Sequence, residues 1–176
     1  LVGWATRKVD YSNDLFTQQA IEFIDQQDEP FFLYLAYTIP HANNEAPHFG
    51  GAGMEVPDLG QYADEKWREE EKRKAAMISR LDSYVGRLLE KLKSEEIEEQ
   101  TLVIFTSDNG PHREGGIDPD FFDSNGPLRG IKRDLYEGGI RVPMIARWPG
   151  RIRPGSESSH ISAFWDVMPT LCAITG

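Results

Sequence analysis

The sequence predicts an α/β fold with a mostly parallel sheet that helices cover on both faces. Two short apolar runs, Phe31–Tyr37 and Thr101–Thr106, have the length and composition of fully buried strands. A long charged segment with helical periodicity separates them, which is the connection that parallel strands require. A third apolar run follows at Val142–Trp148. A length of 176 residues corresponds to one domain or to part of a larger one.

Three helices are predicted around these strands. The first begins at Ser12 or Asn13, either of which can cap it. Its apolar face is predicted to be Phe16, Ala20, Phe23 and Ile24. The second lies within residues 64–99, and its apolar stripe has a spacing of three and four: Ile78, Leu81, Val85, Leu88 and Leu92.

The second helix also predicts two surface ion pairs, Glu69 with Arg73 and Glu70 with Lys74. A third helix is predicted over residues 166–175. It carries Cys172, which its apolar neighbours predict to be a small buried core residue rather than a reactive thiol. The remaining long segments, 38–62 and 107–125, are rich in Gly, Pro and polar residues and are predicted to be loops.

The composition excludes several classes of function. The chain has 29 acidic and 19 basic residues and a formal charge of −10, which disfavours binding to nucleic acid by charge. A single cysteine excludes an internal disulfide framework and a cysteine-rich zinc site. No apolar run approaches the roughly 20 residues of a membrane-spanning helix.

Candidate metal ligands directly follow the second predicted strand. Asp108 and Asn109 offer hard oxygen ligands that suit calcium or magnesium, and ligands bind at the carboxyl ends of strands in α/β sheets. The alternative is that Asp108–Pro111 is only a turn, since each of its residues favours one. Two ligands are in any case too few, because calcium takes about six to eight oxygens.

Histidines provide candidate acid–base and anion-binding groups. His41 follows the first predicted strand and would lie at the same sheet edge as Asp108, where an imidazole can hold an anion or protonate a leaving oxygen. His112 lies close behind the Asp108–Asn109 pair. The alternative for each is a loop histidine bonded to a backbone carbonyl.

Lys132 lies in a locally basic part of this acidic chain. Between Leu128 and Arg153 there are seven basic and two acidic residues, a reversal of charge that suggests attraction of an anion. Lysine is a compact point charge that suits a tetrahedral oxyanion. A surface stripe that balances the acidic helix is the alternative.

Several ordered stretches resemble the formylglycine-dependent sulfatases, the arylsulfatase-like members of the alkaline phosphatase superfamily. The stretches are Pro30–His41 (PFFLYLAYTIPH), Leu81–Leu92 (LDSYVGRLLEKL), Thr106–His112 (TSDNGPH), Gly130–Gly150 (GIKRDLYEGGIRVPMIARWPG) and Trp165–Gly176 (WDVMPTLCAITG). They cover most of the chain in order. The resemblance implies an alkaline phosphatase-like α/β fold.

The resemblance also implies roles for single residues. Asp108 and Asn109 resemble the second pair of ligands to the active-site divalent cation, usually calcium. His41 resembles the histidine that hydrogen-bonds the ester oxygen or the sulfate, and Lys132 the lysine that binds a sulfate oxygen. His112 is added as a candidate substrate-binding residue. Residues of the motif Tyr136–Gly139, together with Arg141, resemble structural parts of the loop that orients this lysine.

The chain departs from the family pattern in one important respect. The family's nucleophile motif, Cys/Ser-x-Pro/Ala-x-Arg, does not occur in these 176 residues, and Cys172 cannot replace it. The first Asp-Asp metal pair is also absent. Residues 1–176 are therefore expected to be part of a sulfatase catalytic domain, inactive alone and unable to retain calcium.

The resemblance implies sulfate monoester hydrolysis by the whole enzyme, on a sulfated small molecule or glycan. Export from the cytoplasm, to the periplasm, the exterior or the lysosome, is a further expectation. Two alternatives stay open, a phosphoric or phosphonic ester hydrolase of the same superfamily and a non-catalytic anion-binding domain.

Overall fold

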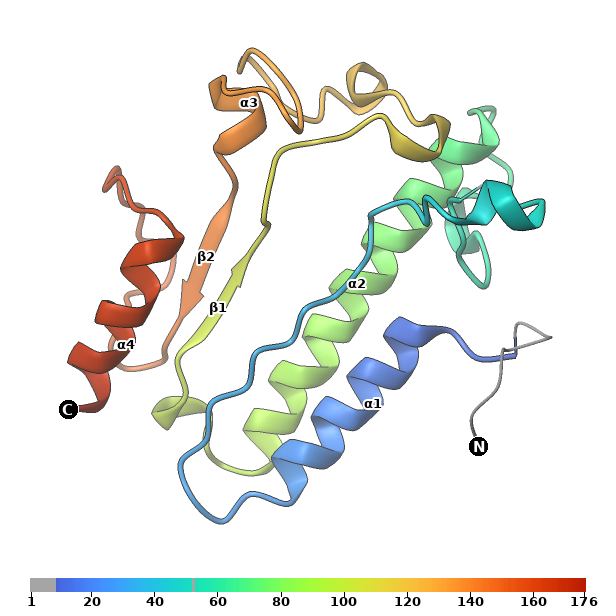
Figure 1. Cartoon of the computed structure of the whole chain (residues 1–176). Helices are drawn as coiled ribbons and strands as arrows, with labels where there is room; N and C mark the ends of the chain where they lie inside the picture. The colour runs from blue at the N-terminus through green and yellow to red at the C-terminus, as the bar shows by residue number, and fades with distance from the viewer. Residues whose placement is uncertain (1–8, 52) are drawn as a thin grey trace.

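The computed structural model describes residues 9–51 and 53–176 of the chain. Figure 1 shows the helices α1 and α2 packed along one another, a pair of antiparallel strands beside them, and α4 at the far side of the strands. The main elements are α1 (Ser12–Asp25), α2 (Glu69–Ser94), β1 (Val103–Thr106), α3 (Glu137–Ile140), β2 (Met144–Arg147) and α4 (Val167–Thr175). Short 3-10 helices lie at Ala46–Phe49, Gly60–Tyr62, Glu98–Gln100, Glu114–Gly116, Pro119–Phe122 and Phe164–Asp166.

The hydrophobic core lies between α2, α1 and the loops at one end of α2. Its buried members are Ile39, Ala42, Met54, Met77, Tyr84 and Ile117. Two of them, Met54 and Met77, are almost inaccessible to solvent. Because this core includes residues on either side of His41 and close to His112, it fixes the loops that carry those histidines.

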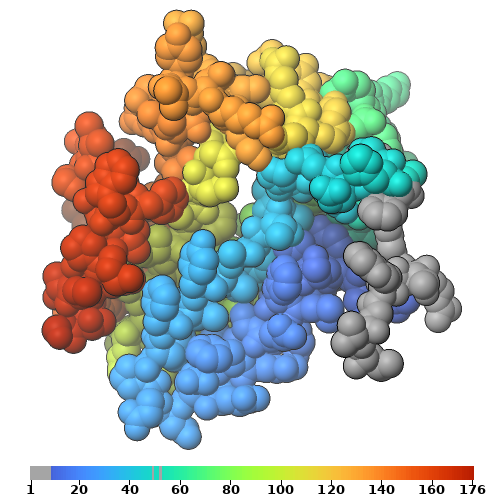
Figure 2. Space-filling view, in the orientation of Figure 1, coloured from blue at the N-terminus to red at the C-terminus, as the bar shows by residue number. Residues whose placement is uncertain are grey.

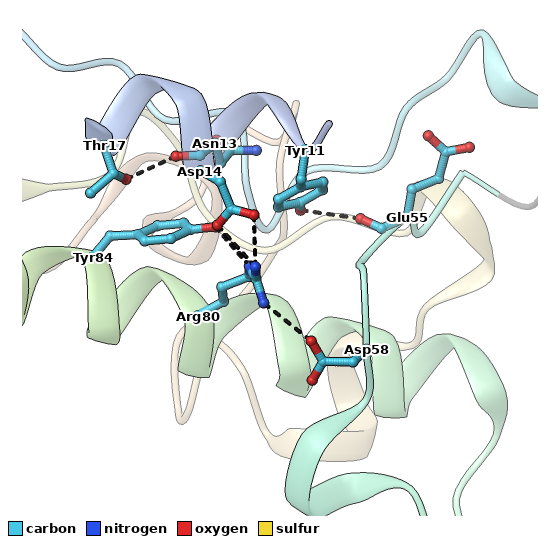
Figure 3. Close-up of polar contacts among 8 residues, drawn as sticks. All are labelled: Tyr11, Asn13, Asp14, Thr17, Glu55, Asp58, Arg80 and Tyr84. Carbon is cyan, nitrogen blue, oxygen red and sulfur yellow. Dashed lines mark hydrogen bonds and ion pairs between the residues drawn. The ribbon is translucent and has the colours of Figure 1, made fainter. Parts of the chain in front are cut away.

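A polar network centred on Arg80 joins α1 to α2 (Figure 3). The Arg80 guanidinium donates to both carboxylate oxygens of Asp14, at 2.9 and 2.7 Å, and to Asp58 at 3.2 Å. The Tyr84 hydroxyl donates to Asp14 at 2.5 Å. Burial would raise the pKa of Asp14, but the hydrogen bonds from Arg80 and Tyr84 outweigh burial and hold this pKa below its usual value.

The described strand pair is antiparallel, so the predicted mostly parallel sheet is not confirmed. Val103 faces Arg147 and Thr106 faces Met144. Both strands lie inside the runs predicted from the sequence, 101–106 and 142–148, and are shorter. Arg147 adds an ion pair to Glu98 at 2.7 Å, which joins β2 to the short 3-10 helix Glu98–Gln100 that precedes β1.

The prediction of a strand over Phe31–Tyr37 is wrong. This segment is extended, and its side chains alternate between half-buried and exposed, but it forms no strand pairing. A β-strand needs a hydrogen-bonded neighbour, and the described residues provide none here. Instead its half-buried aromatic rings pack on the helices: Phe31 against Phe23 and Tyr37 against Tyr84.

The helices form where predicted, but their buried faces differ. In α1 the buried residues are Asn13, Thr17, Ala20 and Ile24, while Phe16 is exposed. Tyr11 takes the N-cap position, and no side chain caps the helix. The shift has a polar cause, since Asn13 and Thr17 hydrogen-bond Thr38 and Tyr37 of the extended segment.

Similar corrections apply to α2 and α4. Ile78 is exposed, although the predicted stripe includes it. The Glu69–Arg73 pair is present, but Lys74 is buried and donates to Ser124 instead of pairing with Glu70 at the surface. Cys172 is exposed rather than buried, because the structure places no element of the described chain over its side of α4.

The chain leaves an unusually large surface open to solvent. Its accessible surface is 13234 Å², whereas a compact protein of this mass exposes about 8,700 Å². The exposed apolar residues include members of the extended segment, β2, α4 and the 3-10 helix before α4: Phe32, Tyr34, Met144, Ile145, Met168 and Trp165. Within residues 9–51 and 53–176 no helix is both long and apolar enough to cross a membrane.

Loops gather at the end of the molecule that lies beyond the N-terminal part of α2. The segments 38–62 and 107–143 adjoin there in Figure 2, in cyan, yellow and orange. Two parts of the segment 107–143, the loop after β1 and the turn at residues 129–139, touch through their backbones. The Gly110 amide donates to the Gly139 carbonyl at 2.9 Å, and the Lys132 amide donates to the Pro111 carbonyl at 2.8 Å. The loop after β1 therefore holds the turn that carries Lys132.

This backbone contact requires glycine. A Cβ atom at Gly110 would lie 1.9 Å from the Gly138 carbonyl oxygen, and one at Gly138 would lie 2.0 Å from the Gly130 carbonyl oxygen. Distances this short cannot be relieved by side-chain rotation, because the neighbouring atoms belong to the backbone.

We therefore expect Gly110→Ala to lower the free energy of unfolding by about 2 kcal/mol or more, because the new methyl group meets the Gly138 carbonyl and forces the loop after β1 away from the Lys132 turn. Urea denaturation measures this change. Gly86→Ala is the matched control, since a Cβ there meets nothing within 4 Å. In the middle of α2 it should raise stability by up to about 1 kcal/mol. Equal effects of the two substitutions would contradict the close contact.

Candidate anion-binding site

His41 enters the site from a short turn that the core anchors. Ile39 and Ala42 on either side of it are buried, and the His41 amide donates to the Thr38 carbonyl at 3.0 Å. Its Nδ1 lies 2.6 Å from the Ala42 carbonyl oxygen, which can only accept, so Nδ1 carries a proton. The Nε2 of a neutral ring then accepts from the Lys132 ammonium at 2.5 Å.

His112 stacks on His41. The ring centroids are 4.8 Å apart and the ring planes are inclined by 27°. Burial lowers the pKa of His112, and His41 and Lys132 lower it further, while Glu114 opposes this change. His112 is therefore predominantly neutral at pH 7, and its ring forms one wall of the site.

Glu114 brings two cationic side chains and two histidines together. Its Oε2 lies 2.8 Å from His112 Nδ1, 3.5 Å from Lys132 Nζ and 3.7 Å from His41 Nε2, and its Oε1 lies 2.8 Å from Arg133. Only 13% of this side chain is exposed. Burial would raise the pKa of Glu114, but His112, Lys132 and Arg133 outweigh it and lower the pKa. Glu114 is thus a carboxylate that these neighbours keep ionised.

A close contact at Gly115 explains how Glu114 reaches His41. Gly115 has a φ of +70°, and a Cβ atom on it would lie 2.8 Å from the Ala42 Cβ and 2.7 Å from the Met54 sulfur. Only glycine allows the loop to approach the buried core so closely in this conformation. The approach places the neighbouring Glu114 beside the His41 turn.

Lys132 and Arg133 lie on a tight turn that hydrogen bonds hold from within. The side-chain amide of Asn125 donates from its Nδ2 to the Leu128 and Gly130 carbonyls at 2.7 and 2.9 Å. The Ile131 amide donates to the Asp134 carboxylate at 2.9 Å. With these bonds and the contact to Pro111, the lysine backbone is fixed, and its side chain is 20% exposed. A fixed, half-buried ammonium of this kind suits recognition of an oxyanion.

Asp108 and Asn109 lie outside this side-chain cluster. Asp108 is exposed and Asn109 is half-buried, and neither side chain forms a hydrogen bond or ion pair with another described residue. Their oxygens fit the chemistry of a hard divalent cation, yet they supply only two of about six to eight ligands. Residues 9–51 and 53–176 contain no group of three or more His, Cys, Asp or Glu residues that could hold a metal.

The sequence therefore predicted part of the site. His41, His112 and Lys132 come together, but no shared edge of a parallel sheet places them, because the segment before His41 forms no strand. Glu114 and Arg133 were not predicted. The available sequence signal for Glu114 was its position as the single acidic residue between His112 and the Gly115–Gly116 pair, and for Arg133 its position directly after Lys132.

Comparison with known proteins gives a consistent family. The Sulfatase family model matches residues 2–176. The chain is 34% identical over 163 residues to the uncharacterized sulfatase YdeN of Escherichia coli, covering 91% of this chain and 27% of that protein. It is 34% identical over 181 residues to human arylsulfatase A, covering 100% of this chain and 30% of the relative.

Comparison with solved structures indicates the same family. The crystal structure of Ps i-CgsB in complex with k-i-k-neocarrahexaose superposes with a TM-score of 0.78 at 32% identity, covering 98% of this chain and 36% of that one. The putative sulfatase yidJ from Bacteroides fragilis gives a TM-score of 0.65 at 26% identity, covering 96% of this chain and 38% of that one. These neighbours imply the alkaline phosphatase-like α/β fold, and the chain spans about a third of the length of these relatives. On its sequence and its structure alike, this chain belongs to the sulfatase family.

Proposed function

We propose that the whole protein containing this chain hydrolyses sulfate monoesters and that the chain supplies the half of the active site that binds the sulfate group. The observation that carries this proposal is the convergence of Lys132, His41 and His112, from three separate segments, on one small volume. Membership of the sulfatase family supports the ester class.

The proposed reaction converts R–O–SO₃⁻ and water to R–OH, SO₄²⁻ and a proton, with cleavage of the bond between sulfur and the ester oxygen. The Lys132 ammonium would donate hydrogen bonds to a sulfate oxygen and offset the charge that develops in the transition state. His41 would exchange its present bond with Lys132 for a bond to the ligand. A neutral His41 accepts at Nε2, so it must take up a proton there before it can donate to the leaving oxygen.

The family resemblance further suggests calcium and a formylglycine nucleophile. Asp108 and Asn109 are the residues of this chain that would hold the cation, and calcium would supply positive charge next to the sulfate oxygens. The nucleophile motif does not occur in these 176 residues. We accordingly propose that the chain alone binds anions without turning over aryl sulfates.

Named relatives suggest a class of substrate and a location. Several of them are N-acetylgalactosamine-6-sulfatases, one is an N-acetylgalactosamine-6-O-sulfatase, and one structural neighbour was solved in complex with k-i-k-neocarrahexaose. We propose a sulfated glycan as the substrate on this basis. We also propose that the protein is exported, in keeping with the extracellular setting in which such glycans occur.

The role of Lys132 leads to a prediction for the whole protein. Lys132→Ala should lower kcat/KM for an aryl sulfate by about 10²- to 10³-fold, since one fixed donor to the developing charge is lost. Lys66→Ala is the matched control, because Lys66 is exposed and makes no ion pair with a described residue. A loss below about threefold in Lys132→Ala would contradict the assignment.

A second prediction concerns the cation. Asp108→Asn in the whole protein should weaken calcium binding at least about tenfold, because it replaces an anionic ligand with a neutral one. Isothermal titration calorimetry measures this affinity, with the exposed Asp28→Asn as the control. The isolated chain should bind calcium weakly or not at all. Equal calcium affinity in Asp108→Asn and in the unaltered protein would mean that Asp108–Pro111 is only a turn.

A further inference from the structure

Glu114 is an unexpected group in an anion-binding site, because it carries the same charge as the proposed ligand. The ion pairs that Lys132 and Arg133 form with described residues all run to this one carboxylate, and the His41 ring lies 3.7 Å from it. Its neighbours come from three segments: His41 from residues 38–42, His112 from the loop that also carries Glu114, and Lys132 and Arg133 from the turn at 129–139.

The carboxylate sets the net charge of the site. With both imidazoles neutral, the cluster contains two cations, Lys132 and Arg133, and one anion, Glu114, which leaves a net charge of +1. That charge balances one negative charge on a ligand. Without the carboxylate the same cluster would carry +2 and would balance two.

We propose that Glu114 is a specificity-determining residue, which makes this site prefer singly charged sulfate monoesters to doubly charged phosphate monoesters of the same shape. The proposal rests on the proposed function and deepens it. Both esters present a tetrahedral group with three terminal oxygens, so contacts with Lys132 and the histidines distinguish them poorly. Their charge differs: attraction to a cluster of net charge +1 at most doubles for the doubly charged ester, whereas the cost of removing an ion from water grows with the square of its charge. Repulsion from Glu114 thus leaves the site too little positive charge to offset the desolvation of a phosphate monoester.

Burial makes this repulsion effective. The Glu114 side chain is 13% exposed, and its Oε2 has no hydrogen-bond partner among the described residues, because the nearby His112 Nδ1 accepts from the Glu114 backbone amide at 3.1 Å. Water therefore screens this carboxylate less than it screens a surface charge. Any ligand within hydrogen-bonding reach of Lys132 Nζ lies close to Glu114, since Nζ and Oε2 are 3.5 Å apart.

The test compares two matched ligands on the purified chain without added metal. Phenyl sulfate carries one negative charge at pH 8, and phenyl phosphate carries two, because the second pKa of a phosphate monoester is near 6. Dissociation constants of both are measured by calorimetry or by ligand-observed NMR for the unaltered chain and for Glu114→Gln, which keeps the shape and removes the charge. Circular dichroism confirms folding.

The matched control is Asp120→Asn. Asp120 lies in the same loop region, is exposed and pairs with Arg113 at 3.6 Å, so this substitution changes the net charge equally but away from the site. We expect Glu114→Gln to favour phenyl phosphate relative to phenyl sulfate by about tenfold or more. Asp120→Asn should leave the ratio of the two dissociation constants unchanged.

A ratio of the two dissociation constants that stays the same in Glu114→Gln would overturn the proposal. If both ligands weaken equally, the ratio is also constant, and Glu114 is only a positioning residue. If Glu114→Gln does not fold, the unaltered chain still decides, since it should bind phenyl sulfate at least as tightly as phenyl phosphate at pH 8. A clear preference for phenyl phosphate would refute the selectivity. Binding of neither ester would contradict the proposed function itself, and the selectivity with it.

Discussion

The placement of Lys132 depends on direct backbone contact between the loop after β1 and the turn at residues 129–139. Gly110 packs so closely against the Gly138 carbonyl that it tolerates no Cβ atom, and the Lys132 amide donates to the Pro111 carbonyl. A second glycine contact, at Gly115, presses the following part of the same loop onto the core beside His41. The loop after β1 thus joins the lysine turn to the histidine turn, and the site exists because glycine permits both contacts.

This arrangement brings positive charges close together. Lys132 and Arg133 are neighbours in sequence on one turn, and the Lys132 ammonium lies against His41. Glu114 offsets their repulsion from inside the cluster, at distances of 2.8 to 3.7 Å from four side chains. The same carboxylate limits how much negative charge a ligand can bring. Stability of the unliganded site and selectivity for its ligand therefore share one residue.

Helical periodicity and short apolar runs in the sequence predicted most of the helices and strands. They did not predict features that depend on contacts with distant parts of the chain. The periodicity of α2 and the short apolar runs at β1 and β2 identified those elements, because these signals lie within the element. The segment 31–37 has the composition of a strand but finds no pairing partner, and Cys172 has apolar neighbours but no covering element. His41, His112 and Lys132 could be predicted because each lies in a recognisable loop. Glu114 could not, since its role follows from the close contact at Gly115.

Histidine NMR tests directly whether His41 and His112 line one anion site. The chain has four histidines, and His48 and His160 make no contact with this cluster. Titration with phenyl sulfate should shift the imidazole resonances of His41 and His112 along curves with one common dissociation constant, while those of His48 and His160 stay in place. Equal shifts of all four histidines, or none at His41 and His112, would contradict the site.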